Sequence, residues 1–201
     1  MGNGNDSLVL QTGSIINGSA DGGAGTNTVT LQGTGTASNA FTNFQTLIMQ
    51  GSAWTWAGSG TFTTVQVQSG TLNVTGTLGA STAATANAGA TLQASSLSMP
   101  PIITNNGLVD FVQTINGSYA GSISGTGAVS KDGAGVLTPT GLNTYSGGTN
   151  FNAGTVAVGG DGNLGAPSGP LTFNGGTPQF TNSFNLSASR PITLNAPGGT
   201  I

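Results

Sequence analysis

Short apolar runs recur along this chain at a fixed offset. Residues 44–58 (FQTLIMQGSAWTWAG) align with residues 62–76 (FTTVQVQSGTLNVTG) at an offset of 18 positions. Within both units apolar and polar positions alternate, which is the period of a half-buried β-strand. The aligned apolar pairs are Phe44 and Phe62, Leu47 and Val65, Met49 and Val67, Trp54 and Leu72, and Trp56 and Val74; the same offset upstream places Val29 and Leu31 under Leu47 and Met49. The pattern predicts a repeated pair of short strands.

A shorter motif recurs further along the chain. It consists of a small residue, a Gly and a Thr, Ala or Leu, followed by an aliphatic, a polar and a second aliphatic residue. Its clearest copies are 69–74 (SGTLNV) and 153–158 (AGTVAV), with looser copies at 89–92, 106–111 and 176–180. Each copy predicts a short strand entered through a Gly turn.

The segment 41–48 fits two periods. Its apolar residues have the spacing of a helix, but its second half aligns with 62–67, whose alternation is that of a strand. We therefore predict a strand from about Thr46, with at most one turn of helix before it.

A repeat of roughly 18–22 residues with two or three strands buries its apolar side by stacking one coil on the next. Equivalent strands then pair in parallel about 4.8 Å apart, and about 10 coils form a rod on the order of 50 Å long. An antiparallel β-sandwich also has many short strands, but its hairpins give no reason for a shared offset of whole two-strand units. We expect one all-β parallel β-helix (β-solenoid) over residues 1–201, with the 18-residue offset clearest at 26–76.

The alternation also predicts which side chains point inward. Polar neighbours such as Gln66 and Asn73 should face solvent. The expected inner ladder contains Leu47, Val65, Leu72, Val74, Leu92, Val156 and Val158.

The composition excludes several classes of function. Charged residues are 3% of the 201 residues, and His and Cys are absent. The chain therefore has no Ser-His-Asp triad and no Cys/His zinc site. With only 2 basic residues it has no electrostatic footprint for nucleic acid, and no apolar run approaches the roughly 18 residues that span a bilayer. We expect no catalytic residues, no metal and no cofactor.

A dense motif carries a family resemblance. Residues 119–138 read YAGSISGTGAVSKDGAGVLT, followed by GLNTYSGGT at 141–149, NAGTV at 152–156 and Leu164-Gly165. This run resembles the passenger-associated repeat of bacterial autotransporters, the type V secreted proteins, and we place the repeat at 119–165. Segments 43–76 and 169–177 also resemble passenger coils. Pro139 and Pro178 depart from the pattern, since each stands where the family has a Leu, and Pro cannot donate to a strand ladder.

The resemblance implies a right-handed β-helix at the cell surface or outside a Gram-negative bacterium. It also implies a partner, the outer-membrane translocator barrel of the same polypeptide. That barrel and a signal peptide are both missing here, and the sequence ends within a repeat, so we expect an excised piece of a longer protein. The implied role is a structural stalk or adhesin segment without catalysis, with a host-cell or cell–cell surface ligand as a further partner.

Two alternatives stay open. A β-helix that binds or degrades glycans, like a phage tailspike, would need clustered carboxylates. The Asp residues are scattered in the sequence, and only Asp110 and Asp132, about one coil apart, could meet. The second alternative is an ice-binding face built from repeated Thr-x-Thr pairs, at 26–30, 34–36, 61–63 and 75–77, although their spacing is uneven.

Other candidate groups have a structural interpretation that we favour. Segments 2–8 and 22–29 partly fit a calcium-binding nonapeptide with Asp6 and Asn27 as ligands, but a Gly-rich turn explains them better. Trp54 and Trp56 fill the core or form a sugar-stacking platform. The segment 131–133 (KDG) is predicted to be a turn in which Asp132 bonds its own backbone. Arg190 is predicted to be a charge at an edge or turn.

The C-terminal region carries alternating aliphatic residues without a polar cap. Ile192-Thr193-Leu194 and Thr200-Ile201 would leave an unpaired parallel edge. We expect end-to-end self-association there, or disorder of the last coil.

Overall fold

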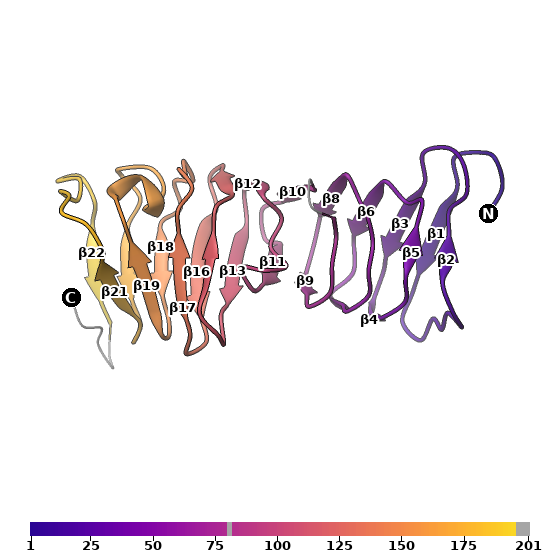
Figure 1. Cartoon of the computed structure of the whole chain (residues 1–201), viewed down its shortest axis with the longest axis horizontal. Helices are drawn as coiled ribbons and strands as arrows, with labels where there is room; N and C mark the ends of the chain where they lie inside the picture. Colours follow the sequence, from indigo (N-terminus) through magenta and orange to yellow (C-terminus); the bar gives the residue numbers. More distant parts are fainter. Residues whose placement is uncertain (80–81, 196–201) are drawn as a thin grey trace.

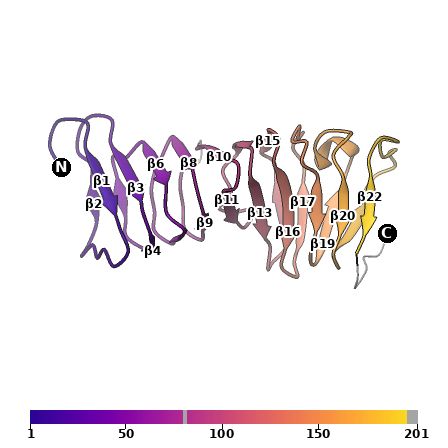
Figure 2. The same ribbon diagram turned by 180° about the vertical axis from the view of Figure 1, so that it is seen from behind.

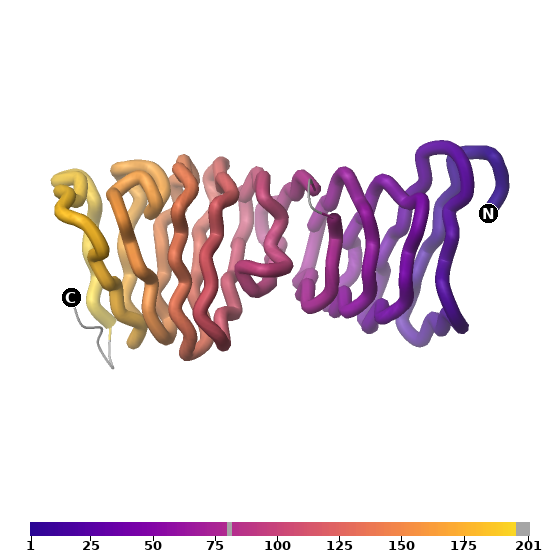
Figure 3. Tube along the Cα trace, in the orientation of Figure 1, coloured from indigo at the N-terminus to yellow at the C-terminus, as the bar shows by residue number. Residues whose placement is uncertain are grey.

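The computed structural model describes residues 1–79 and 82–195. The chain winds into an elongated rod, with its N-terminus at one end and its C-terminus at the other (Figure 1). Successive coils stack along the long axis, as the trace in Figure 3 shows. All strand pairs in the described part of the chain are parallel, so the fold is a parallel β-helix and not an antiparallel sandwich.

Each coil passes through as many as three sheets, which Figure 2 shows from the opposite side. The seven-stranded sheet contains β1 (Ser7–Leu10), β3 (Thr28–Leu31), β6 (Thr46–Met49), β8 (Thr64–Val67), β10 (Ala83–Ala86), β12 (Ile102–Asn105) and β15 (Ser122–Ser124). The nine-stranded sheet contains β4 (Thr34–Ala37), β7 (Ala53–Trp56), β9 (Thr71–Val74), β11 (Thr91–Ala94), β13 (Leu108–Val112), β16 (Ala128–Asp132), β18 (Thr149–Phe151), β20 (Leu171–Phe173) and β22 (Ile192–Leu194).

The third position in the coil is less regular. It holds the pair β2 (Ala20–Asp21) and β5 (Phe41–Thr42), and the four-stranded sheet β14 (Gly117–Tyr119), β17 (Val136–Pro139), β19 (Thr155–Val158) and β21 (Thr177–Phe180). A 3-10 turn, η1 (Asp161–Leu164), is the one helical element among the described residues. No helix in the described ranges is long and apolar enough to cross a membrane.

The register follows the predicted offset. Leu47 pairs with Val65 and Met49 with Val67, while Trp54 pairs with Leu72 and Trp56 with Val74. Upstream, Val29 pairs with Leu47. The strand predicted from about Thr46 is β6, and no helix precedes it.

The predicted inner ladder is confirmed. Leu47, Val65, Leu72, Val74, Leu92, Val156 and Val158 are all buried, and Gln66 and Asn73 are partly exposed. Along the nine-stranded sheet the inward side chains of adjacent strands stack in register as Trp56, Val74, Ala94, Phe111, Lys131, Phe151 and Phe173. The hydrophobic core is therefore a column of stacked side chains, and Lys131 occupies a position in it.

The copies of the short Gly-Thr motif occupy two different sheets. Those that begin at Thr71, Thr91 and Leu108 are β9, β11 and β13 of the nine-stranded sheet. Those that begin at Thr155 and Thr177 are β19 and β21 of the four-stranded sheet. The motif therefore marks a Gly turn followed by a strand, without specifying which side of the coil the strand occupies.

Pro139 and Pro178, which depart from the family pattern, lie within strands. Each occupies a position where the missing N–H costs no ladder bond. Pro178 is in β21, the edge strand of its sheet. Pro139 ends β17, and the next N–H, of Thr140, donates to the carbonyl of Tyr119 at 2.8 Å. Because successive N–H groups alternate in direction along a strand, the N of Pro139 faces β19, where pairing has already ended at Leu137 and Val156.

Candidate functional site

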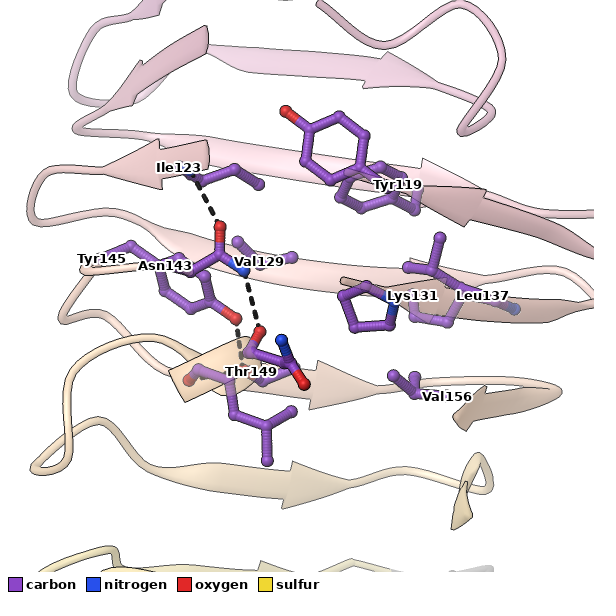
Figure 4. A pocket seen from close by; sticks show the side chains of 13 residues that line it. Tyr119, Ile123, Val129, Lys131, Leu137, Asn143, Tyr145, Thr149 and Val156 are labelled. Atoms are coloured by element: carbon purple, nitrogen blue, oxygen red, sulfur yellow. Dashed lines mark hydrogen bonds between the residues drawn. The ribbon is translucent and has the colours of Figure 1, made fainter. Parts of the chain in front are cut away.

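The interior of the rod between β14 and η1 contains polar side chains as well as apolar ones. A cavity of about 20 Å³ lies there, room for about one water molecule, and Figure 4 shows the side chains around it. Asn143 bridges coils, because its Oδ1 accepts from the Ile123 N–H and its Nδ2 donates to the Asn163 carbonyl, both at 2.9 Å. The Tyr145 and Thr149 hydroxyls lie 2.8 Å apart. These side chains hydrogen-bond to groups of neighbouring coils, which stabilises the fold and forms no open site.

The turn predicted at 131–133 is corrected: Lys131 and Asp132 belong to β16, the chain bends only after Asp132, and Lys131 is buried. It lies inward on β16 between Phe111 and Phe151 and is 1% exposed. Its Nζ donates to three carbonyls, of Asp132, Gly133 and Ala153, at 2.7–3.1 Å. Burial lowers the pKa of this ammonium, and the nearby Asp carboxylates oppose that shift. Val129 and Lys131 are two residues apart on one strand, so they point to the same side. The inward position of Lys131 could therefore have been predicted from the alternation in the sequence.

Arg190 ends a turn, as predicted, because its N–H donates to the Ser187 carbonyl, but its side chain is buried. Its Nε donates to Asp161 Oδ1 at 2.6 Å, an ion pair in which the Arg side chain is fully covered. The remaining guanidinium N–H groups donate to the carbonyls of Asp161, Leu164, Gly165 and Gly169 at 2.9–3.2 Å. All five donors of the guanidinium are thus used to hold the loop that contains η1.

Asp110 and Asp132 do meet, on the outer face of the nine-stranded sheet. Asp110 pairs in register with Ser130, so Asp132 is its diagonal neighbour on the next coil. Asp110 is largely buried, since only 7% of it is exposed, and its Oδ1 has no hydrogen-bond partner. Burial is the main cause that raises the pKa of Asp110 to about 6; the neighbouring Asp132 carboxyl contributes to the rise, while the bond from Gln93 opposes it.

The two carboxyl groups interrupt a row of amides that we call the outer amide ladder: Gln93, Asp110, Asp132, Asn152, Asn174 and Asn195. On one side, Gln93 Nε2 donates to Asp110 Oδ2 at 2.8 Å. On the other side, each Asn donates to the preceding coil, ending with Asn152 Nδ2 on Asp132 Oδ2 at 2.9 Å. Asp132 therefore bonds a side chain of the next coil, and the expected bond to its own backbone is not formed. The ladder directs amide donors at the carboxyl pair from both ends.

Asn27, one of the two candidate calcium ligands, bonds the backbone of neighbouring coils through its side chain. Asn27 Oδ1 accepts from the Asp6 N–H at 2.7 Å, and its Nδ2 donates to the Asn43 carbonyl at 2.8 Å. Within the described ranges no three His, Cys, Asp or Glu side chains gather into a metal site. Asn27 instead joins three coils, which is the structural interpretation that the Gly-rich segments favoured.

Neither a sugar-stacking platform nor a threonine array is present at the predicted positions. Trp54 and Trp56 are both buried, and their indole N–H groups donate to the carbonyls of Gln32 and Thr77. The pairs at 28–30 and 34–36 lie in β3 and β4, which belong to different sheets, and those at 61–63 and 75–77 lie largely outside the strands. The Thr-x-Thr pairs therefore do not form one ice-binding face.

Comparisons with known proteins confirm the resemblance to autotransporter passengers. The sequence profile described as the passenger-associated-transport-repeat matches residues 129–158, from β16 to β19. Over 88 residues the chain is 35% identical to the protein named adhesin BmaC autotransporter, from Brucella suis biovar 1 (strain 1330). That match covers 44% of this chain, which spans 2% of the length of this relative. No solved structure matches the chain.

Proposed function

We propose that this chain is a rod-shaped, non-catalytic segment of an adhesin-like surface protein, and that it acts as a spacer between the bacterial surface and an adhesive tip. The observation that carries the proposal is the continuous parallel register of the nine-stranded sheet from β4 to β22, which gives the coils a common axis. The passenger repeat at 129–158 and the likeness to a protein named an adhesin support the same assignment.

Two features support a role without catalysis. Glycosidase carboxyl groups flank an open cleft that admits the sugar, whereas Asp110 is only 7% exposed and both Asp110 and Asp132 accept amide N–H groups of neighbouring coils. A depression of about 500 Å³ lies between Gly60 and Pro101, and no carboxylate lines it. The surface of the rod is dominated by Thr, Ser, Asn and Gly.

The proposed setting follows from the passenger resemblance. The chain would be carried to the outside of a Gram-negative cell by a translocator barrel of the same polypeptide. Its tip would meet a host-cell or cell–cell surface ligand. The 201 residues would then supply about 50 Å of reach per copy of this segment.

Surface display tests the spacer role. The full chain is joined at its C-terminus to the translocator of a known autotransporter and carries a short epitope at its N-terminus. On cells with long surface polysaccharide, we expect an antibody to reach the epitope when the chain is present. The matched control fuses the epitope to the translocator directly, and there the polysaccharide should mask it.

The readout distinguishes the alternatives. Equal antibody binding with and without the chain, although both fusions are on the surface, would contradict the spacer role. Release of sugars from the polysaccharide by the displayed chain, lost in Asp110→Asn, would favour the glycan-degrading alternative. Intact polysaccharide with a reachable epitope is the result that the proposal expects.

A further inference from the structure

The carboxyl pair on the outer amide ladder has an unfilled hydrogen-bonding requirement. Asp110 Oδ2 and Asp132 Oδ2 each accept one amide N–H, from Gln93 and Asn152. Asp110 Oδ1 is shielded from water and has no donor. Carboxylates only accept hydrogen bonds, so an ionised Asp132, the diagonal neighbour on the next coil, cannot supply the missing donor, and this oxygen stays unpaired at the cost that a buried polar group carries.

A single proton meets this requirement. Placed on Asp110 Oδ1, it lets that oxygen donate to the Asp132 carboxylate across the boundary between two coils. The pair would then carry one negative charge in place of two, and the outer amide ladder would be continuous from Gln93 to Asn195. An O–H···O⁻ bond of this kind is among the stronger hydrogen bonds in proteins.

We propose that Asp110 and Asp132 share one proton in mildly acidic solution, and that this shared proton clamps the coils of β13 and β16 so that the rod becomes more stable as the pH falls. The geometry of the pair carries the proposal: the two acids are diagonal neighbours on paired strands and an amide fixes each from its far side. The direction is opposite to that of most acid titrations, in which ionised native carboxylates lose their partners.

The groups packed around the pair do not provide another partner for the buried oxygen. On β11 the facing residue is Gln93, and on β18 Asn150 donates to Ser130 while Asn152 donates to Asp132. Lys131 is the nearest cation, but it points into the core and its Nζ is occupied by three carbonyls. Its charge weakens the tendency of Asp110 to hold a proton without cancelling it.

The stability change that the shared proton causes falls in a pH range where few other side chains titrate. Asp110 has its folded pKa raised from 3.8 to about 6, so it binds a proton more tightly in the folded chain than in the unfolded one. The resulting stabilisation is complete below pH 3.8 and is lost as the pH rises through about 6. The chain has no His or Cys and all five acidic residues are Asp, so no other side chain with an ordinary pKa titrates between pH 5 and 7.5.

Thermal unfolding of the full chain at pH 7.5 and pH 5.0, at constant ionic strength, tests the proposal. The wild-type midpoint should rise by about 3–6 °C on acidification. Asp110→Asn and Asp132→Asn should each abolish the rise. The control Asp21→Asn, whose carboxylate is exposed and bound to Gly23 and Asn43, should keep it.

Infrared difference spectra between the two pH values keep the test decisive if a variant fails to fold. The folded wild-type chain should gain a protonated-carboxyl band at pH 5.0. A midpoint that stays constant or falls on acidification, or a rise that survives both Asn variants, overturns the proposal. Absence of the infrared band in the folded wild-type chain overturns it as well.

Discussion

Phe151 and Phe173 stack face to face across adjacent coils, with ring centroids 4.5 Å apart and ring planes inclined by 13°. They are register partners in β18 and β20, so the ladder of the backbone imposes the stacking of the side chains. Both are buried, and they form part of a separate core cluster with Val156, Val158 and Leu164.

Phe151→Ala is expected to lower the free energy of unfolding by about 3–5 kcal/mol, because it opens a cavity between two coils. Chemical denaturation measures the change. The matched control is Phe180→Ala, a residue that is 44% exposed at the edge of its sheet and should cost far less. Equal losses for the two variants would show that the stacked column is not the source of stability.

The arrangement of the ladders could be predicted from the sequence, because a fixed offset and a period of two determine both register and facing. Lys131 follows the same rule, yet the Lys-Asp-Gly sequence at 131–133 favoured a turn. Position in the alternation outweighed residue type there, since the long side chain can bury its stem and bring its ammonium to the carbonyls of a turn.

The burial of Arg190 could not be predicted from the repeat pattern, for a different reason. Its partners, Asp161 and the carbonyls of 161–169, lie 21–29 residues earlier in an irregular loop, where no repeat predicts contacts. The proximity of Asp110 to Asp132 followed from the coil length alone. The loss of solvent at Asp110 depends on how Gln93, Ser130 and their neighbours pack, and the sequence pattern does not encode it.

Arg190→Ala is expected to cost about 3–5 kcal/mol, since it leaves Asp161 and four carbonyls without their donor. Arg190→Lys should recover only part of this loss, because an ammonium has three donors where the guanidinium has five. Urea unfolding of both variants beside the exposed neighbour variant Ser189→Ala checks the order. A Lys variant as stable as the wild type would contradict the five-bond role.

Gly35 and Trp54 are expected to be energetically coupled. A Cβ on Gly35 would lie 2.6 Å from the Trp54 ring, and the ring cannot turn freely because its N–H donates to the Gln32 carbonyl. Gly35→Ala should therefore cost about 1–3 kcal/mol despite the lower strand propensity of Gly. In a Trp54→Leu background, which copies the Leu72 of the next coil, the cost should shrink. An unchanged cost in both backgrounds would argue against the contact.

The exposed edge at β22 is expected to mediate self-association of this chain. Ile192 and Leu194 are 50% and 55% exposed, and among the residues that the structure describes β22 has a partner strand on one side only. The other predicted edge residues, Thr200 and Ile201, lie outside the described residues. Thr193→Lys should lower the mass that light scattering detects at high concentration, because a Lys on an edge strand disfavours pairing with another chain.

The control for that prediction is Thr172→Lys, which places the same charge in the same outward row one coil further in. It should leave the association unchanged. A wild-type chain that stays monomeric at every concentration would refute the edge contact.

Distances between spin labels along the rod test the central claim most directly. The chain has no Cys, so labels can be placed at Thr55, Asn150 and Thr193 without background. These residues share one outward row, in which Asn150 is five coils and Thr193 seven coils from Thr55. The parallel β-helix predicts separations of about 24 Å and about 34 Å, growing by about 4.8 Å per coil. Two separations that do not increase with the number of coils would contradict the rod and, with it, the spacer role.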